Sequence, residues 1–241
     1  MLLILVIFTG LFKEFLLVFS IIIIHELGHL FSAVYYKWNI DKISIYPYGG
    51  CVSFNEKLNR PIREEFIILI MGPLVQVFYL LVFYLFFRFG FVSFKTFVLF
   101  KTYNFTLLCF NLLPIYPLDG GRIVNLLFNF FLPYRKCNFL IIVISILFIF
   151  IVIVNCSSVN LVMMMVFVLS EVFVFIKQQD YLYNKFLLER FLFNFSFYRV
   201  RVIKNKNNFY RGKRHVLYNN FKYVTEKEYL KGRYRWKGLY F

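Results

Sequence analysis

The chain has 241 residues, of which 61% are hydrophobic, 23% aromatic and only 17% charged, and its formal net charge is +16. A soluble domain of this length needs a polar surface that this composition does not easily supply. The apolar residues also come in long blocks, so the sequence argues against a soluble protein and predicts one embedded in a membrane.

The apolar blocks predict an all-α polytopic membrane protein with about six transmembrane segments. A helix that crosses a bilayer needs about 20 predominantly apolar residues, and the first block is too short to cross alone. The stretch around Gly49-Gly50, after the second block, alternates loosely and predicts a short β-hairpin at the membrane surface. The expected segments cover about 1–12, 15–36, 65–87, 96–117, 138–154 and 159–176.

The distribution of basic residues predicts the orientation. With a cytoplasmic N-terminus and six crossings, most Lys and Arg residues fall on the cytoplasmic side. Residues 177–241 hold 16 Lys and Arg against 4 Asp and Glu. We therefore expect an intramembrane domain over 1–176 and a basic cytoplasmic tail over 177–241. Such a tail typically contacts anionic lipid, and because it has no RNA- or DNA-binding motif we expect no nucleic-acid partner.

The second apolar segment contains the pattern His25-Glu26-Leu27-Gly28-His29. On a helix this spacing puts two imidazoles on one face, close enough to share one zinc ion. The intervening Glu26 lies beside such an ion and can take a proton from water. The pattern also arises by chance in soluble proteins, but ionisable groups inside a membrane helix are costly and are retained mainly for function.

A catalytic zinc ion takes three protein ligands and keeps one position open. His215 lies in the basic tail, and Glu171 fits an ordinary carboxylate near a helix end. Asp119 follows Pro114 and Pro117, which break the fourth apolar segment. The residues alone leave two interpretations of this stretch equally open: non-helical backbone that lines a cavity, or a simple turn at a helix end.

Two motifs resemble, in order, the signatures of the site-2-protease class of intramembrane metalloproteases, peptidase family M50. They are HELGH at 25–29 and NLLPIYPLDGG at 111–121. The resemblance covers about residues 1–190 and is strongest to the sporulation subgroup. Four further stretches carry it: Pro47-Tyr-Gly-Gly, Asn59-Arg-Pro-Ile-Arg-Glu-Glu-Phe66, Gly72-Pro73-Leu74 and Phe186-Leu-Leu-Glu-Arg190.

This resemblance implies that one zinc ion per chain is bound by His25, His29 and Asp119, with Glu26 as the general base. It also implies residues that shape the site and hold an extended substrate: Asn111, Pro114 and Pro117. Gly72-Pro73 would face the same cavity. The subgroup usually carries a regulatory CBS domain after its spans. Only about 50 residues follow Arg190 here, so Arg211-Gly-Lys-Arg-His215 would be a remnant of such a domain.

The function implied is regulated intramembrane proteolysis. The substrate would be a membrane-tethered protein cut near its cytoplasmic boundary, in the first instance a sporulation sigma-factor precursor. Membrane regulatory proteins would be further partners, in the bacterial cytoplasmic membrane or the membrane around the forespore, with the active site facing the cytoplasm. Three alternatives stay open: a site-2 protease that trims anti-sigma factors, a metal transporter and a non-enzymatic membrane scaffold.

Overall fold

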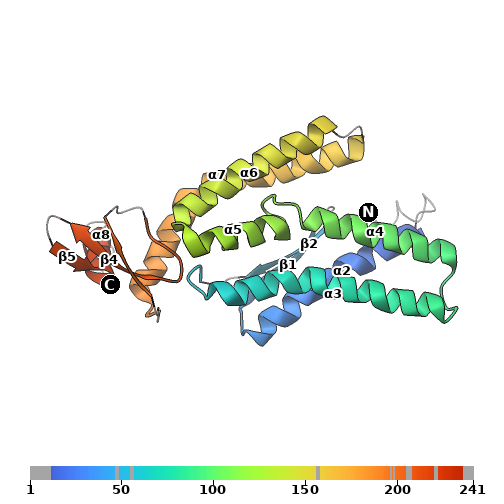
Figure 1. The fold of residues 1–241 in the computed structure, drawn as a ribbon, viewed down its shortest axis with the longest axis horizontal. Coiled ribbons are helices and arrows are strands. Elements are labelled where there is room, and N and C mark those ends of the chain that lie inside the picture. The colour runs from blue at the N-terminus through green and yellow to red at the C-terminus, as the bar shows by residue number, and fades with distance from the viewer. Residues whose placement is uncertain are drawn as a thin grey trace. The chain divides into compact units, whose positions relative to one another are not determined.

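The computed structural model shows a mainly helical chain that divides into two compact units (Figure 1). The first unit comprises residues 1–56 and 66–113, and the second comprises 57–65 and 114–241. The residues that the structure describes are 12–46, 49–54, 57–155, 158–195, 197, 199–204, 208–219 and 222–235.

Among its described residues, the first unit contains α2 (Phe12–Tyr35), α4 (Phe94–Asn111) and most of α3 (Ile62–Arg88). Helices α2 and α3 approach closely because both carry glycine at the contact. A Cβ at Gly28 would lie 2.6 Å from the carbonyl oxygen of Met71. Small residues allow such backbone-to-backbone packing between membrane helices, and here they bring the histidine-bearing face of α2 against α3.

Two antiparallel strands follow α2, as predicted for this stretch. They are β1 (Ile40–Tyr46) and β2 (Gly49–Phe54), paired in the register Tyr46 with Gly49 and Ser44 with Cys51. The two glycines at which the sequence placed the bend belong to β2. Strand β2 also contacts α2, so the hairpin lies beside the helix that carries the HExxH pattern.

The second unit contains α5 (Asp119–Phe131), α6 (Tyr134–Asn155) and α7 (Val159–Leu192). Helices α6 and α7 pack as an antiparallel helical hairpin (Figure 1). The proline-containing connection before α5 is held against both. The Tyr116 N–H donates to Ser145 Oγ at 2.9 Å, and the Tyr116 ring stacks on Phe175 at 3.8 Å between centroids. The peptide bond between Tyr116 and Pro117 is cis.

The end of the chain forms a small sheet in the order β3-β4-β5. Its elements are β3 (Val200–Ile203), β4 (Arg214–Asn219), β5 (Lys222–Thr225) and the helix α8 (Glu226–Arg235). Strands β3 and β4 are parallel, and β4 and β5 are antiparallel. Their core is closed by the last turns of α7, through Phe186 and Leu187.

Four described helices are long and apolar enough to cross a membrane: α2, α3, α6 and α7. Large apolar side chains stay exposed along them, among them Phe31, Phe78, Phe150 and Met163, which suits a lipid-facing surface. The predicted first segment lies outside the described residues except for Phe12, so six crossings stay a prediction.

Two details of the predicted fold need correction. The segment expected over 96–117 is helical only to Asn111, because Pro114 and Pro117 cannot continue the helix. The all-α description is wrong for the tail, where a three-stranded sheet follows a helix that runs on to Leu192. At 1.5 Å per residue, the 34 residues of α7 span roughly 50 Å, well beyond the ~30 Å apolar core of a bilayer.

Candidate metal centre

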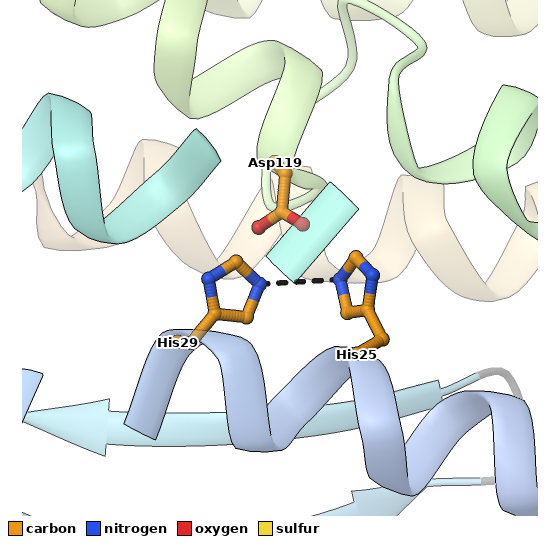
Figure 2. A group of neighbouring side chains, drawn as sticks. All are labelled: His25, His29 and Asp119. Carbon is orange, nitrogen blue, oxygen red and sulfur yellow. Dashed lines mark hydrogen bonds between the residues drawn. The ribbon is translucent and has the colours of Figure 1, made fainter. Parts of the chain in front are cut away.

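The two histidines of the HExxH pattern lie one turn apart on the buried face of α2 (Figure 2). Only 4% of His25 and 6% of His29 is exposed. Their rings meet edge to face, and the two Nε2 atoms lie 3.1 Å apart. The i, i+4 spacing therefore turns both imidazoles toward one point, as the sequence predicts.

Each imidazole is fixed through its other nitrogen. His29 Nδ1 lies 2.8 Å from the backbone oxygen of Ile68 on α3. A carbonyl oxygen only accepts, so this Nδ1 carries the proton and donates. His25 Nδ1 lies 2.9 Å from the side-chain oxygen Oε1 of Gln76, which is also on α3. Both Nδ1 atoms are therefore donors, which leaves Nε2 without a proton on each neutral ring.

The two Nε2 lone pairs thus point toward the same place beside α2. A cation between the two Nε2 atoms would be coordinated by both rings, in place of the short contact that joins them in Figure 2. In tetrahedral zinc coordination with bonds of about 2.0–2.1 Å, two nitrogen ligands are separated by roughly 3.3 Å. The observed 3.1 Å is close to this value, so the imidazole pair fits a zinc ion.

Gly72 makes room for this arrangement. A Cβ at this position would lie 2.3 Å from His29 Nε2, so no larger residue fits while the ring keeps its place. The resemblance placed Gly72-Pro73 beside the site, and the structure places Gly72 directly against the His29 ring.

The other predicted residues fall in both units. Glu26 follows His25 on α2 and is half-buried. Asn111, the last residue of α4, has its side-chain nitrogen 3.4 Å from His25 Nε2, which suits an amide that donates to the bare nitrogen. The first unit therefore brings Asn111 to the imidazole pair, while its contact with substrate stays a prediction.

Asp119, Pro114 and Pro117 belong to the second unit. Asp119 is the first residue of α5 and half-buried, and the two prolines precede it. Gly121 allows the sharp entry into this helix, since a Cβ there would lie 2.4 Å from the backbone carbon of Ile115. Figure 2 draws the three predicted zinc ligands. Coordination by Asp119 stays a prediction.

His215 and Glu171, the other candidate ligands in the sequence, lie in different surroundings. His215 is buried in the C-terminal sheet, where it accepts from the Tyr210 N–H at 2.9 Å and contacts Glu226 at 3.1 Å. Burial lowers the pKa of His215, and the charges of Arg190 and Lys213 lower it further, against the raising influence of Glu226. Glu171 is half-buried on α7.

Sequence reasoning missed the partners that orient the imidazoles. Gln76 was read only as part of an apolar span, and the backbone oxygen of Ile68 leaves no trace in a residue pattern. A signal was available for Gln76, because a polar side chain within a membrane helix is costly and calls for a named partner.

Comparison with known proteins extends this picture. The family model for peptidase family M50 matches residues 14–93 and 88–154. Stage IV sporulation protein FB of Bacillus subtilis is 36% identical over 188 residues, which cover 76% of this chain and 65% of that protein. A zinc metalloprotease of Methanocaldococcus jannaschii is 35% identical over 125 residues, 51% of this chain and 36% of that protein.

A solved structure, the site-2 protease of Methanocaldococcus jannaschii, aligns with a TM-score of 0.49 and 25% identity over 81% of this chain and 89% of that one. The chain spans less than two thirds of the length of the two curated relatives. Its matches to the family model cover more than half of its residues, including all of α3 and α4 and all of α2 from residue 14 onward. The chain therefore belongs to peptidase family M50, and it is an integral membrane protein of that family.

Proposed function

We propose that this protein is an intramembrane zinc metalloprotease whose metal is held by His25, His29 and Asp119. The observation that supports it best is the pair of buried imidazoles whose Nε2 atoms lie 3.1 Å apart. Two nitrogens leave zinc one protein ligand short, and Asp119 supplies a half-buried carboxylate at the start of α5. Family membership and the order of the two motifs support the same set.

The reaction proposed is hydrolysis of a peptide bond. Bound zinc would make water nucleophilic near neutral pH and polarise the carbonyl under attack. Glu26 takes the proton of the attacking water and returns it to the departing amide nitrogen. Asn111 donates from its side-chain nitrogen toward the same place, so it is suited to hold the substrate backbone. Pro114 and Pro117 prevent helix in the adjoining connection and favour an extended substrate there.

The substrate class follows from the setting. A peptide bond within a helix is shielded by its hydrogen bonds, so the cleaved stretch must unwind at the membrane. We expect a membrane-tethered protein cut near its cytoplasmic boundary, and a sporulation sigma-factor precursor is the first candidate. The similarity to a sporulation protein of Bacillus subtilis supports that choice. The basic residues favour a site and C-terminus that face the cytoplasm.

The exposed basic residues of the C-terminal sheet suit contact with anionic lipid. Among them are Arg199, Arg201, Arg214, Lys222 and Lys227. Each basic residue near an anionic surface contributes about 1 kcal/mol, and this attraction is screened by salt. Slower amide exchange over 199–227 in anionic than in zwitterionic nanodiscs, with the difference lost at high salt, is the result expected.

The deciding experiment co-expresses the protein with candidate membrane-tethered sigma-factor precursors and compares product sizes. Glu26→Gln should abolish cleavage while the purified protein keeps its zinc, because Glu26 moves a proton and does not ligate. His25→Ala should lose both. Cleavage that survives in Glu26→Gln contradicts the protease proposal. Zinc bound by a wild type that cleaves neither these precursors nor membrane-tethered anti-sigma factors leaves a transporter as the better explanation.

A further inference from the structure

Gln76 is fully buried in the middle of α3, where its amide joins three helices. Its oxygen Oε1 lies 2.9 Å from His25 Nδ1 on α2. Its nitrogen Nε2 donates to the backbone oxygen of Asn104 on α4 at 2.9 Å. A buried amide in a membrane helix is retained at a cost, and both ends of this one are satisfied.

The contact with α4 fixes which way the amide points. The backbone oxygen of Asn104 only accepts, so the Gln76 nitrogen must face it. The Gln76 oxygen therefore faces His25, and it only accepts as well. The proton of a neutral His25 is consequently held on Nδ1, and Nε2 stays bare toward His29.

Without an acceptor at this position, the proton on Nδ1 would lose the 2.9 Å hydrogen bond that holds it there. A neutral imidazole whose proton moved to Nε2 would point a donor at His29 and present no lone pair to a metal. The His29 proton is held on Nδ1 by the backbone oxygen of Ile68, an acceptor that a substitution of the Ile68 side chain would not remove. The acceptor at His25 Nδ1 is thus a side chain, whereas the acceptor at His29 Nδ1 is backbone.

We propose that Gln76 is a positioning residue that selects the metal-binding tautomer of His25 and holds its ring. This inference rests on the proposed function, in which His25 binds zinc. It assigns a different part to Gln76 than to Glu26. Gln76 governs how tightly zinc is held, whereas Glu26 moves a proton after zinc is bound. Outer partners of this kind typically contribute about 10–100-fold in metal affinity.

Three variants test the proposal in the full-length protein in detergent micelles. Gln76→Leu removes both hydrogen bonds at similar size. Gln76→Glu keeps an acceptor oxygen for His25 Nδ1, since a carboxyl oxygen accepts whether the group is ionised or neutral. Tyr79→Phe is the matched control, because it removes a hydrogen bond between α3 and α2, from Tyr79 to Ser20 at 3.3 Å, one turn away from the imidazoles.

Two measurements separate position from general stability. Competition with a zinc-binding dye should show a loss of about 10–100-fold in affinity for Gln76→Leu, and wild-type affinity for Gln76→Glu and Tyr79→Phe. Nitrogen-15 NMR of the imidazoles in zinc-free protein should show the His25 proton on Nδ1 in the wild type and moved in Gln76→Leu alone.

Wild-type zinc affinity and an unchanged His25 tautomer in Gln76→Leu would overturn the inference. An equal loss in Tyr79→Phe would do so too, since it would assign the effect to helix packing. Failure of the proposed function is distinct from either result. It would appear as a wild type that binds no zinc, and in that case the tautomer measurement still decides whether Gln76 controls His25.

Discussion

Replacement of Asp119 tests whether its carboxylate is the third zinc ligand or an ordinary acidic side chain. Asp119→Ala should lower zinc affinity by more than about 100-fold, because outer-shell partners alone contribute 10–100-fold. Cleavage should be lost with it. Glu171→Gln is the matched control, since it neutralises a half-buried carboxylate of α7 that was set aside as a ligand. Zinc titration of the purified variants measures both.

The reverse pattern would contradict this assignment. If Asp119→Ala keeps its zinc and Glu171→Gln loses it, the third ligand comes from α7 and the proline-containing connection is a turn. The comparison also separates Asp119 from Glu26, whose substitution by Gln leaves the metal in place under the proposed function.

At the scale of the helices, the close approach of α2 and α3 fixes the His29 ring. Gly72→Ala should leave the helices intact, since alanine is the better helix former by about 1 kcal/mol. The added Cβ would lie 2.3 Å from His29 Nε2, so the ring must swing away from Ile68. Cleavage should fall by about 100-fold, the cost of misplacing a reacting group by roughly 1 Å.

A cleavage assay with a matched glycine checks this. Gly232→Ala, on α8, is the control because a Cβ there meets nothing within 4 Å, and it should cleave like the wild type. Full activity of Gly72→Ala would mean that the imidazole has room to relax, and that the glycine is not needed for the site.

Local pattern predicted the helices that carry the site and failed where the contacts are distant in sequence. The HExxH spacing placed both imidazoles correctly, because i and i+4 always share a helix face. The partners that hold those rings lie far along the chain, since Gln76 is 51 residues from His25 and Ile68 is 39 residues from His29. No periodicity reports such a contact. The carboxylate ligand likewise could be named only through the family resemblance.

The C-terminal region was harder to predict for a related reason. Strands β3 and β5 have four residues each, too short to show clear alternation. Their core also depends on Phe186 and Leu187, which lie in the half of α7 that was read as the beginning of a basic tail. The basic residues correctly predicted a charged surface for this region, but they gave no sign of its buried core.

At the scale of the whole molecule, a buried ionic network ties the C-terminal sheet to the helices. Arg190, at the end of α7, donates to Glu226 Oε1 at 2.7 Å and to Asn59 Oδ1 at 2.8 Å. Asn59 precedes α3 and also donates to Glu189 at 3.0 Å. Arg211 pairs with Glu65, in the first turn of α3, at 2.5 Å. The sheet therefore holds the segment that leads into α3.

This network predicts a fold of the C-terminal region that weakens in acid. Burial alone would raise the pKa of Glu226, but the hydrogen bond from His215 and the charge of Arg190 outweigh it and lower the pKa to about 2. A carboxyl whose pKa is depressed by folding stabilises the fold above its unfolded value and loses that contribution as the pH falls toward the folded value. The loss should therefore run from about pH 4.5 down to about pH 2.

His215 should add a second loss of stability in acid, which begins at a higher pH than the loss from Glu226. Its Nε2 accepts from the Tyr210 N–H, so a proton there would break that bond, and its pKa is lowered from 6.5, chiefly by burial. Below about pH 6.5 the unfolded chain binds a proton at this histidine that the folded chain does not bind, so stability should begin to fall there.

Amide exchange of residues 208–235, corrected for the intrinsic pH dependence of exchange, measures both steps. Glu226→Gln should lower protection at pH 7, because a buried ion pair that loses one partner costs about 3–5 kcal/mol, and should remove the step below pH 4.5. Protection that stays constant from pH 7 to pH 3 in the wild type would show that these buried groups do not hold the sheet in place.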